Sequence, residues 1–303
     1  MMAVHSEIPE GWRQLARLFD LSNQKALVTG GAVGLGRACA TALAMAGVDV
    51  AIVGRTEKAV EATCKALRQF GVEAFFVKCD VSDADQVEAM TDEVVRKFGH
   101  IDIAINNAGG SPDRPALELH RDEWTRTLDV NLSGVFWCAQ AEARRMARRD
   151  PAGGKIINIA SMYATVAGGN CAYNASKAGV VHLTRSLAAE WSAYNINVNC
   201  ISPGWTLTPG NPLSDDLRRR MREITPLGSL MRYRDMYGAV IYLASAASDF
   251  VTGQELTIDG GHTITPWLDP IRRATAVRYS QADEESGLNV DLAALSSTEA
   301  GRG

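Results

Sequence analysis

Short apolar runs alternate with longer amphipathic segments over most of this chain, and this alternation constrains the fold more than any other feature. The apolar runs are short and rich in β-branched residues, which favours strands over helices. Their nearly continuous apolar character indicates strands that are covered on both faces. Strands and helices in strict alternation build one parallel sheet with right-handed crossovers. The sequence therefore predicts an α/β protein with a single doubly wound parallel sheet of about seven strands and helices on both faces.

The predicted elements follow one another from residue 25 to residue 258. Strands are expected at Lys25–Val28, Val48–Val53, Ala74–Val77, Ile101–Ile105, Lys155–Ile159, Asn197–Ile201 and Glu255–Ile258. Helices are expected at Gly34–Ala46, Thr56–Phe70 and Asp83–Phe98, within Asp122–Arg149, at Cys171–Trp191 and near Arg234–Ala244. The stretch between the sixth strand and the last helix is expected to be irregular.

One domain is expected, because residues 25–262 contain no linker rich in Pro, Gly or Ser. Residues 1–24 form an N-terminal extension in which Trp12, Leu15, Leu18 and Phe19 could build a short docking helix. Residues 263–303 form a C-terminal extension, and its distal part from Gln281 is polar and expected to be mobile.

Composition and charge exclude several classes of function. The net charge of −4 does not fit a general nucleic-acid binder. No stretch reaches the ~18 apolar residues of a membrane span, and no secretory signal peptide is evident. The six cysteines lack the spacing of a zinc site, so we expect no metal and a reducing compartment. These observations predict a cytoplasmic protein that acts on a small molecule and binds neither nucleic acid nor membrane.

Two arginine clusters stand out, at residues 144–149 and 218–222. We interpret both as solvated helix faces. A contact with a partner, or with a substrate that carries phosphate, is the alternative.

The first predicted strand leads directly into a glycine cluster, Thr29-Gly30-Gly31-Ala32-Val33-Gly34-Leu35-Gly36, and a helix follows. Gly30 permits a tight turn. Gly34 and Gly36 allow the backbone to approach a pyrophosphate at the helix N-terminus, where unpaired N–H groups favour anions. This order of strand, glycines and helix predicts a dinucleotide site, with a Gly-x3-Gly-x-Gly spacing.

The end of the second predicted strand bears on the choice of nicotinamide cofactor. The run Ile52-Val53-Gly54-Arg55-Thr56 has no carboxylate that could bind the ribose hydroxyls. Arg55 suits the 2′-phosphate of NADP, and Thr56 could add a hydroxyl. NADP(H) is therefore favoured over NAD(H), although Val33 in the glycine loop supplies no second cation.

Tyr173 and Lys177 lie four residues apart, so they share one face of a predicted helix. An ammonium about 4 Å from a phenol favours the phenolate by roughly 4 kcal/mol, which could lower a pKa of about 10 by up to about three units. Tyr173 would then serve as a general acid/base near neutral pH. Ser161 follows the fifth predicted strand, at the carboxyl edge where ligands bind in open α/β sheets.

These motifs resemble those of the classical short-chain dehydrogenase/reductase family over roughly residues 22–262. Further matches are Asp80-Val81, Asn106-Asn107-Ala108-Gly109, Asn131 in Asp129-Val130-Asn131, Pro203-Gly204 and Asp259-Gly260-Gly261. The resemblance implies a Rossmann fold and hydride transfer between the nicotinamide and a carbonyl or secondary alcohol. It also implies a homotetramer or homodimer, formed through the helices that carry Asn131 and Tyr173.

The resemblance implies a role for each matching residue. Tyr173 would exchange a proton with the substrate oxygen, and Ser161 would donate a hydrogen bond to it. Lys177 would hold the nicotinamide ribose and lower the pKa of Tyr173, while Asn131 would anchor a water. The residues implied to contact the cofactor are Gly30, Gly34, Leu35, Gly36, Arg55, Thr56, Asp80, Val81, Asn107, Ala108, Gly109, Tyr173, Lys177, Pro203, Gly204, Thr206 and Thr208.

The substrate pocket is predicted from residues that flank the catalytic motifs. These are Gly110, Ser111, Met162, Tyr163, Val166, Asn170 and Trp205. Residues 161–163 and 201–206 resemble members of the family that act on polyols, ketoses and gluconate, so a sugar alcohol or keto-sugar is favoured. The segment Thr206–Thr225 is expected to form a mobile lid.

Several alternatives stay open. Within the family, reduction of a 3-oxoacyl thioester and oxidation of a cyclic or steroid alcohol are possible. A non-catalytic regulatory protein that binds the dinucleotide would be expected to lack the Tyr or Lys. An epimerase or dehydratase of the extended branch is disfavoured by the glycine spacing and by the lack of a larger C-terminal substrate domain.

Overall fold

A computed structural model describes residues 10–110, 112, 114–168, 170–208 and 213–264. Seven strands form one parallel sheet in the order β3-β2-β1-β4-β5-β6-β7. The strands are β1 (Lys25–Thr29), β2 (Asp49–Gly54), β3 (Ala74–Lys78), β4 (Ile103–Asn106), β5 (Gly154–Ile159), β6 (Ile196–Pro203) and β7 (Glu255–Ile258). The strand order reverses between β1 and β4, so the predicted doubly wound sheet is confirmed.

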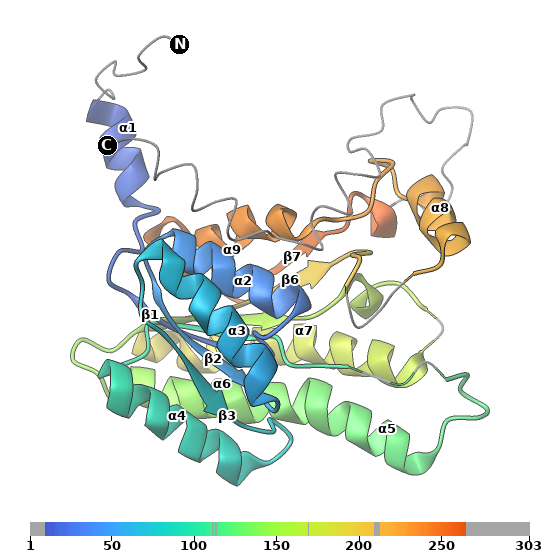
Figure 1. The fold of residues 1–303 in the computed structure, drawn as a ribbon, viewed down its shortest axis with the longest axis horizontal. Coiled ribbons are helices and arrows are strands. Elements are labelled where there is room, and N and C mark those ends of the chain that lie inside the picture. The colour runs from blue at the N-terminus through green and yellow to red at the C-terminus, as the bar shows by residue number, and fades with distance from the viewer. Residues whose placement is uncertain (1–9, 111, 113, 169, 209–212, 265–303) are drawn as a thin grey trace.

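Helices cover both faces of this sheet (Figure 1). One face packs against α2 (Gly34–Met45), α3 (Glu57–Leu67) and α9 (Tyr237–Ala244), and the other against α4 (Ala84–Phe98), α6 (Gly134–Ala147) and α7 (Cys171–Trp191). The remaining helices are α1 (Glu10–Arg17), α5 (Arg121–Leu128) and α8 (Asp215–Ile224).

The strands are apolar throughout because each one supplies both cores. In β1, Ala26 and Val28 pack on the side of α2 and α9, whereas Leu27 packs on the side of α4 and α6. In the register of the sheet, Thr29 lies level with Val53 of β2 and Asn106 of β4. The segments that follow β1, β2 and β4 therefore meet at one carboxyl edge of the sheet, which is where such folds bind ligands.

The helix predicted within Asp122–Arg149 is present, with one correction: it is not α-helical throughout. Between α5 and α6 the chain makes a π-helical turn at Asp129–Ser133. In this turn the side chain of Asn131 donates from Nδ2 to the carbonyl of Thr127, four residues earlier, at 2.8 Å. The side chain thus occupies an acceptor of the α-helical ladder, and such turns often mark functional sites.

A second correction concerns α8, which lies in a stretch predicted to be irregular and inside the predicted lid. Its start carries recognisable signals, because the Ser214 hydroxyl accepts from the N–H of Leu217 at 3.3 Å and Asp215 and Asp216 occupy the first turn. Leu217 and Met221 on the inner face of α8 pack with Trp205, Leu207, Leu213 and Leu230. The other predicted elements agree within a few residues, and α7 and β7 have the predicted bounds.

The N-terminal extension contains α1, but the expected docking of its apolar side chains is not observed. No residue of α1 is buried, and Trp12 is 64% exposed. The next segment does contact the domain, because the carbonyl of Leu18 accepts from the N–H of Ala247 at 2.9 Å. Of the C-terminal extension, the part from residue 265 lies outside the described residues. None of the helices described here has the length and apolar content needed to cross a membrane.

Candidate active site

The glycine loop ends in a helix N-terminus that is open to an anion. Gly30 and Gly34 both adopt positive φ, 64° and 60°, which a glycine accommodates without strain. Helix α2 then begins at Gly34, its N-cap residue Val33 makes no side-chain cap, and its first turn holds no acid. A Cβ placed on Gly34 would meet only Thr208, at 3.9 Å. The N–H groups of this uncapped helix N-terminus fit the pyrophosphate of a dinucleotide.

Gly36 is needed for a different reason from the predicted one. A Cβ at this position would lie 2.3 Å from the carbonyl oxygen of Gly30 and 2.4 Å from Nδ2 of Asn107. Gly36 therefore permits close packing of α2 against the loops that follow β1 and β4.

Thr29 joins the glycine loop to the loop after β4, and the prediction did not include it among the site residues. Its hydroxyl oxygen accepts from the N–H groups of Asn107 and Ala108, at 3.0 and 3.1 Å. In return, Asn107 Nδ2 donates to the carbonyls of Thr29 and Gly30, at 3.1 and 3.2 Å. The sequence signal for Thr29 was its place at the end of a strand, directly before the first glycine.

Arg55 follows β2 and is exposed, and it forms no ion pair with a described residue. The pKa of Asp80 is lowered, mainly by the hydrogen bond from the Ser82 hydroxyl at 2.7 Å and in part by the charge of Arg55. Val81, a predicted cofactor contact, is buried together with residues of α4 and α6, and Thr56 is the N-cap of α3. Because the charge of Arg55 contributes to the lowered pKa of Asp80, these two side chains lie on the same part of the sheet edge.

The catalytic side chains predicted from the motifs converge at the carboxyl end of β5. The N–H of Tyr173 donates to Oδ1 of the helix cap Asn170 at 3.1 Å, which sets the first turn of α7. The Ser161 hydroxyl lies near enough to the Tyr173 phenol to lower its pKa, and it accepts from the N–H of Tyr163 at 3.2 Å. Lys177 is only 3% exposed, and its Nζ donates to the carbonyl of Ile159 at 2.8 Å.

The predicted lowering of the Tyr173 pKa is wrong for this structure. Lys177 Nζ lies 5.5 Å from the centre of the Tyr173 ring and is directed at a backbone carbonyl. Burial raises the pKa of Tyr173, and the hydrogen bond with Ser161 opposes this rise only in part. Burial also lowers the pKa of Lys177 to about 8. Desolvation is therefore the largest cause of the pKa shift in both groups.

Asn131 lies in the π-helical turn and holds the loop after β4. Its Nδ2 donates to the carbonyl of Gly110 at 2.6 Å, and its Oδ1 accepts from the N–H of Gly110 at 2.9 Å. A Cβ on the preceding Gly109 would lie 2.5 Å from Asn131 Oδ1 and 3.6 Å from Lys177 Nζ. Asn131 and Lys177 therefore approach the same loop from two helices.

The structure places the predicted substrate residues in different surroundings. Tyr163 lies edge-on to Tyr173 and to Trp205, with ring centres 6.4 and 5.9 Å away, so these three rings form an aromatic wall. Met162 is 2% exposed and is counted among the buried apolar residues. Asn170 caps α7 and also donates to the carbonyl of Pro112. Ser111 lies outside the described residues.

Two glycines shape this region. Gly168, which the prediction omitted, lies against the Tyr163 ring, since a Cβ there would be 2.3 Å from its Cε1. Gly204 follows Pro203 at the end of β6 and packs on Asp259. A Cβ placed on Gly204 would lie 2.7 Å from the Cα of Asp259. Of the two threonines beyond it, Thr206 is buried and Thr208 lies next to Gly34, 3.9 Å from a Cβ placed there.

Comparisons with known proteins agree with this geometry. The family model described as enoyl-(acyl carrier protein) reductase matches residues 30–263. D-threitol dehydrogenase of Mycolicibacterium smegmatis is 41% identical over 250 residues, covering 81% of this chain and 95% of that protein. The 3-oxoacyl-[acyl-carrier-protein] reductase FabG of Staphylococcus aureus is 38% identical over 242 residues, covering 78% of this chain and 97% of that protein. A solved structure of gluconate 5-dehydrogenase from Burkholderia cenocepacia, in complex with NADP and tartrate, is 37% identical with a TM-score of 0.79, covering 83% of this chain and 99% of that one.

The sheet, the glycine loop and the convergent Ser161, Tyr173 and Lys177 define an oxidoreductase of the Rossmann fold that uses a nicotinamide cofactor. The chain belongs to the short-chain dehydrogenase/reductase family, as its motifs predicted, and acts on alcohol or carbonyl groups of small molecules.

Proposed function

We propose that this protein transfers a hydride between NADP(H) and a polyol or keto-sugar, with Tyr173 as the general acid/base. The observation that carries the proposal is the convergence of the Ser161 hydroxyl and the Tyr173 phenol beside an open glycine loop. Two hydroxyls that meet at one substrate oxygen polarise a carbonyl as negative charge develops on it.

The cofactor supplies the hydride chemistry, and the residues of this chain orient the substrate and manage one proton. The raised pKa of Tyr173 keeps its phenol protonated at neutral pH, which suits proton donation during reduction. Ser161 donates a hydrogen bond to the same oxygen. Lys177, with its pKa near 8, is largely charged at neutral pH and lies where it can hold the nicotinamide ribose. Asn131 keeps the loop at Gly109 and Gly110 in place.

The substrate class rests on the relatives and on the pocket wall. Threitol dehydrogenase and gluconate 5-dehydrogenase act on small hydroxylated molecules by name. The aromatic wall of Tyr163 and Trp205 offers flat surfaces with polar edges beside the catalytic pair. The similarity to FabG favours reduction of a 3-oxoacyl thioester as the second candidate. The arginine cluster on α8 lends that candidate little support, because Arg219 and Arg220 pair with Asp216.

Cofactor preference, assembly and compartment are part of the same proposal. The exposed Arg55 and the NADP in the gluconate 5-dehydrogenase structure support NADP(H) over NAD(H). The helices that carry Asn131 and Tyr173 would form the contact of a homodimer or homotetramer. All six thiols are free, as is usual in the reducing cytoplasm.

Oxidation of NADPH and NADH by the purified full chain tests the proposal. The substrates are ketoses, diketones and 3-oxoacyl thioesters, and polyols are assayed in the reverse direction. Turnover with NADPH on ketoses is expected, and Tyr173→Phe should lower kcat by at least about 10²-fold while it still binds NADPH.

Three results would contradict parts of the proposal. Turnover of 3-oxoacyl thioesters alone would replace the substrate class. A preference for NADH would contradict the role of Arg55. Tight cofactor binding without turnover on any substrate would favour a regulatory function.

A further inference from the structure

A chain of buried polar side chains runs beneath the active site. Glu142 on α6, Asn106 on β4, Asn158 on β5 and Thr184 on α7 are each at most 1% exposed. Asn106 Nδ2 donates to Glu142 Oε2 at 3.0 Å and to Asn158 Oδ1 at 3.2 Å. Asn158 Nδ2 donates to the Thr184 hydroxyl at 3.0 Å. This network therefore links four elements that are distant in the sequence.

Three of these elements carry a residue of the site or lead directly into one. Asn106 directly precedes Asn107, whose loop borders the cofactor site. Asn158 lies level with Asn106 in the sheet and shortly before Ser161. Thr184 shares α7 with Tyr173 and Lys177. A displacement within the network would be passed to the loop after β4 first, because Asn106 is directly bonded to it through the backbone.

Two oxygens of this network have no hydrogen-bond partner among the described residues. They are Glu142 Oε1 and Asn106 Oδ1, and both are buried. Two acceptors that both lack a donor are unusual in a protein interior, where nearly all buried polar atoms are paired. A proton on the carboxyl group removes the difficulty, because a carboxylic acid has one O–H donor and keeps an acceptor. A neutral carboxylic acid and a primary amide can form two hydrogen bonds with each other, one donated by the amide N–H and one donated by the acid O–H.

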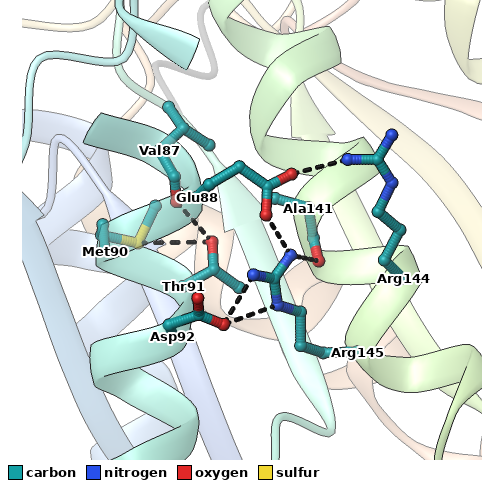
Figure 2. Close-up of polar contacts among 8 residues, drawn as sticks. All are labelled: Val87, Glu88, Met90, Thr91, Asp92, Ala141, Arg144 and Arg145. Carbon is teal, nitrogen blue, oxygen red and sulfur yellow. Dashed lines mark hydrogen bonds and ion pairs between the residues drawn. The ribbon is translucent and has the colours of Figure 1, made fainter. Parts of the chain in front are cut away.

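The surroundings of Glu142 also favour the neutral acid. It forms no ion pair with any described residue, and the thiol of Cys138, four residues earlier on α6, lies near enough to be affected by its charge. The nearby arginines of α6 are occupied, since Arg144 and Arg145 pair with Glu88 and Asp92 of α4 (Figure 2). A carboxylate without a partner in the core is costly. Burial accordingly raises the pKa of Glu142 to about 8.

We propose that Glu142 is a positioning residue, held as a neutral carboxylic acid whose pairing with the Asn106 amide fixes the cofactor loop Asn107–Gly109. Glu142 touches neither cofactor nor substrate and acts through Asn106. When Glu142 ionises, its O–H donor is lost and only the bond from Asn106 Nδ2 remains, so the loop is held less firmly. The affinity for the cofactor should then fall.

Glu142→Gln tests this directly, because a glutamine amide has the shape of the neutral acid and places an N–H where the acid has its O–H. The readout is the dissociation constant of NADPH for the full chain, measured by fluorescence at pH values below and above 8, the pKa of Glu142. This measurement needs no substrate, so it is independent of the proposed substrate class. At the lower pH values the variant should match the wild type within about twofold. At the higher values the wild type should bind at least about threefold more weakly than the variant. Lys177 titrates in the same range, but it is present in both proteins, so the comparison isolates Glu142.

Three further measurements complete the test. The infrared carbonyl band of a protonated carboxyl should be present in the wild type at neutral pH and absent from Glu142→Gln. Glu142→Leu should weaken NADPH binding by about 5-fold or more at every pH. Glu190→Gln, an exposed position on α7, is the matched control and should change nothing.

Two results would overturn the proposal. One is a Glu142→Gln variant that binds NADPH as weakly at low pH as Glu142→Leu, which would mean that the negative charge is required. The other is a wild type with the same pH profile as Glu142→Gln and no protonated carboxyl band. If Glu142→Leu does not fold, the infrared band and the pH profile of Glu142→Gln still decide.

Discussion

Helix α6 carries one polar cluster toward α4 and another toward the sheet, and the two differ in nearly every physical respect. Toward α4, Arg144 and Arg145 pair with Glu88 and Asp92, whose side chains are 39% and 70% exposed. Toward the sheet, Glu142 meets only the amide of Asn106, and both are buried. The acids of the exposed cluster are stabilised as anions by water and arginine. The acid of the buried cluster has neither, so it is stable when neutral.

This contrast shows that the number of charges in a cluster does not indicate its importance. Exposed ion pairs typically contribute about 0–1 kcal/mol and weaken with salt. A buried polar group that loses its partner costs about 1–3 kcal/mol. The cluster with more charges is therefore the one whose loss should matter less.

The largest expected effect is a difference in the pH dependence of stability between wild type and Glu142→Gln. The unfolded chain releases this proton near the ordinary value of 4.5, whereas the folded protein keeps it up to about 8. The folded state binds more protons in this window, so the unfolding free energy of the wild type falls as pH rises through it. The contribution is fully present below the window, and up to about 5 kcal/mol is lost above it, at about 1.36 kcal/mol per pKa unit.

Urea denaturation of both proteins across this range gives the difference directly. The contributions of the other carboxyl groups to the pH dependence cancel, because both proteins contain these groups. Lys177, whose pKa is lowered to about 8, adds stability as pH rises above the window and also cancels. Parallel curves for the two proteins would show that Glu142 is ionised at neutral pH and that the two faces of α6 do not differ in this way.

A smaller loss is expected for Asn106→Leu. The leucine removes two hydrogen bonds and leaves the carboxyl of Glu142 and the amide of Asn158 without this partner. The unfolding free energy should fall by about 3 kcal/mol, as expected for two orphaned buried groups. Gln69→Leu, an exposed position, is the control for a change from amide to leucine. A loss below about 1 kcal/mol would place Asn106 in the same class as the exposed cluster.

The smallest effect is expected for Arg145→Met. It removes the pairs with Glu88 and Asp92 but keeps much of the side chain's apolar stem. The unfolding free energy should change by less than about 1 kcal/mol, and the change should shrink further in high salt. The dissociation constant of NADPH should stay the same. Arg144→Met, which loses only the pair with Glu88, is the matched comparison, and a larger loss there would contradict this account.

Much of the fold and part of the site could be predicted because they depend on neighbours in the chain. The bounds of α7 and β7 follow from local periodicity. The open N-terminus of α2 follows from the order of strand, glycine and helix. Helix α8 also had local signals, in Ser214 and the two acids after it, and the prediction passed over them. The π-helical turn was less accessible, because it depends on where the side chain of Asn131 finds its partners.

The sequence by itself determined the order of the elements, the parallel sheet and the places of the glycine loop, Ser161, Tyr173 and Lys177. These depend on periodicity and turn chemistry within a few residues. Only the tertiary structure decided that Met162 is core, that the pKa of Tyr173 rises and that Glu142 is buried beside Asn106. In the sequence, Glu142 is one polar residue among the arginines of α6. Its burial depends on strands that lie far away in the chain, and burial determines whether a carboxyl group keeps its proton.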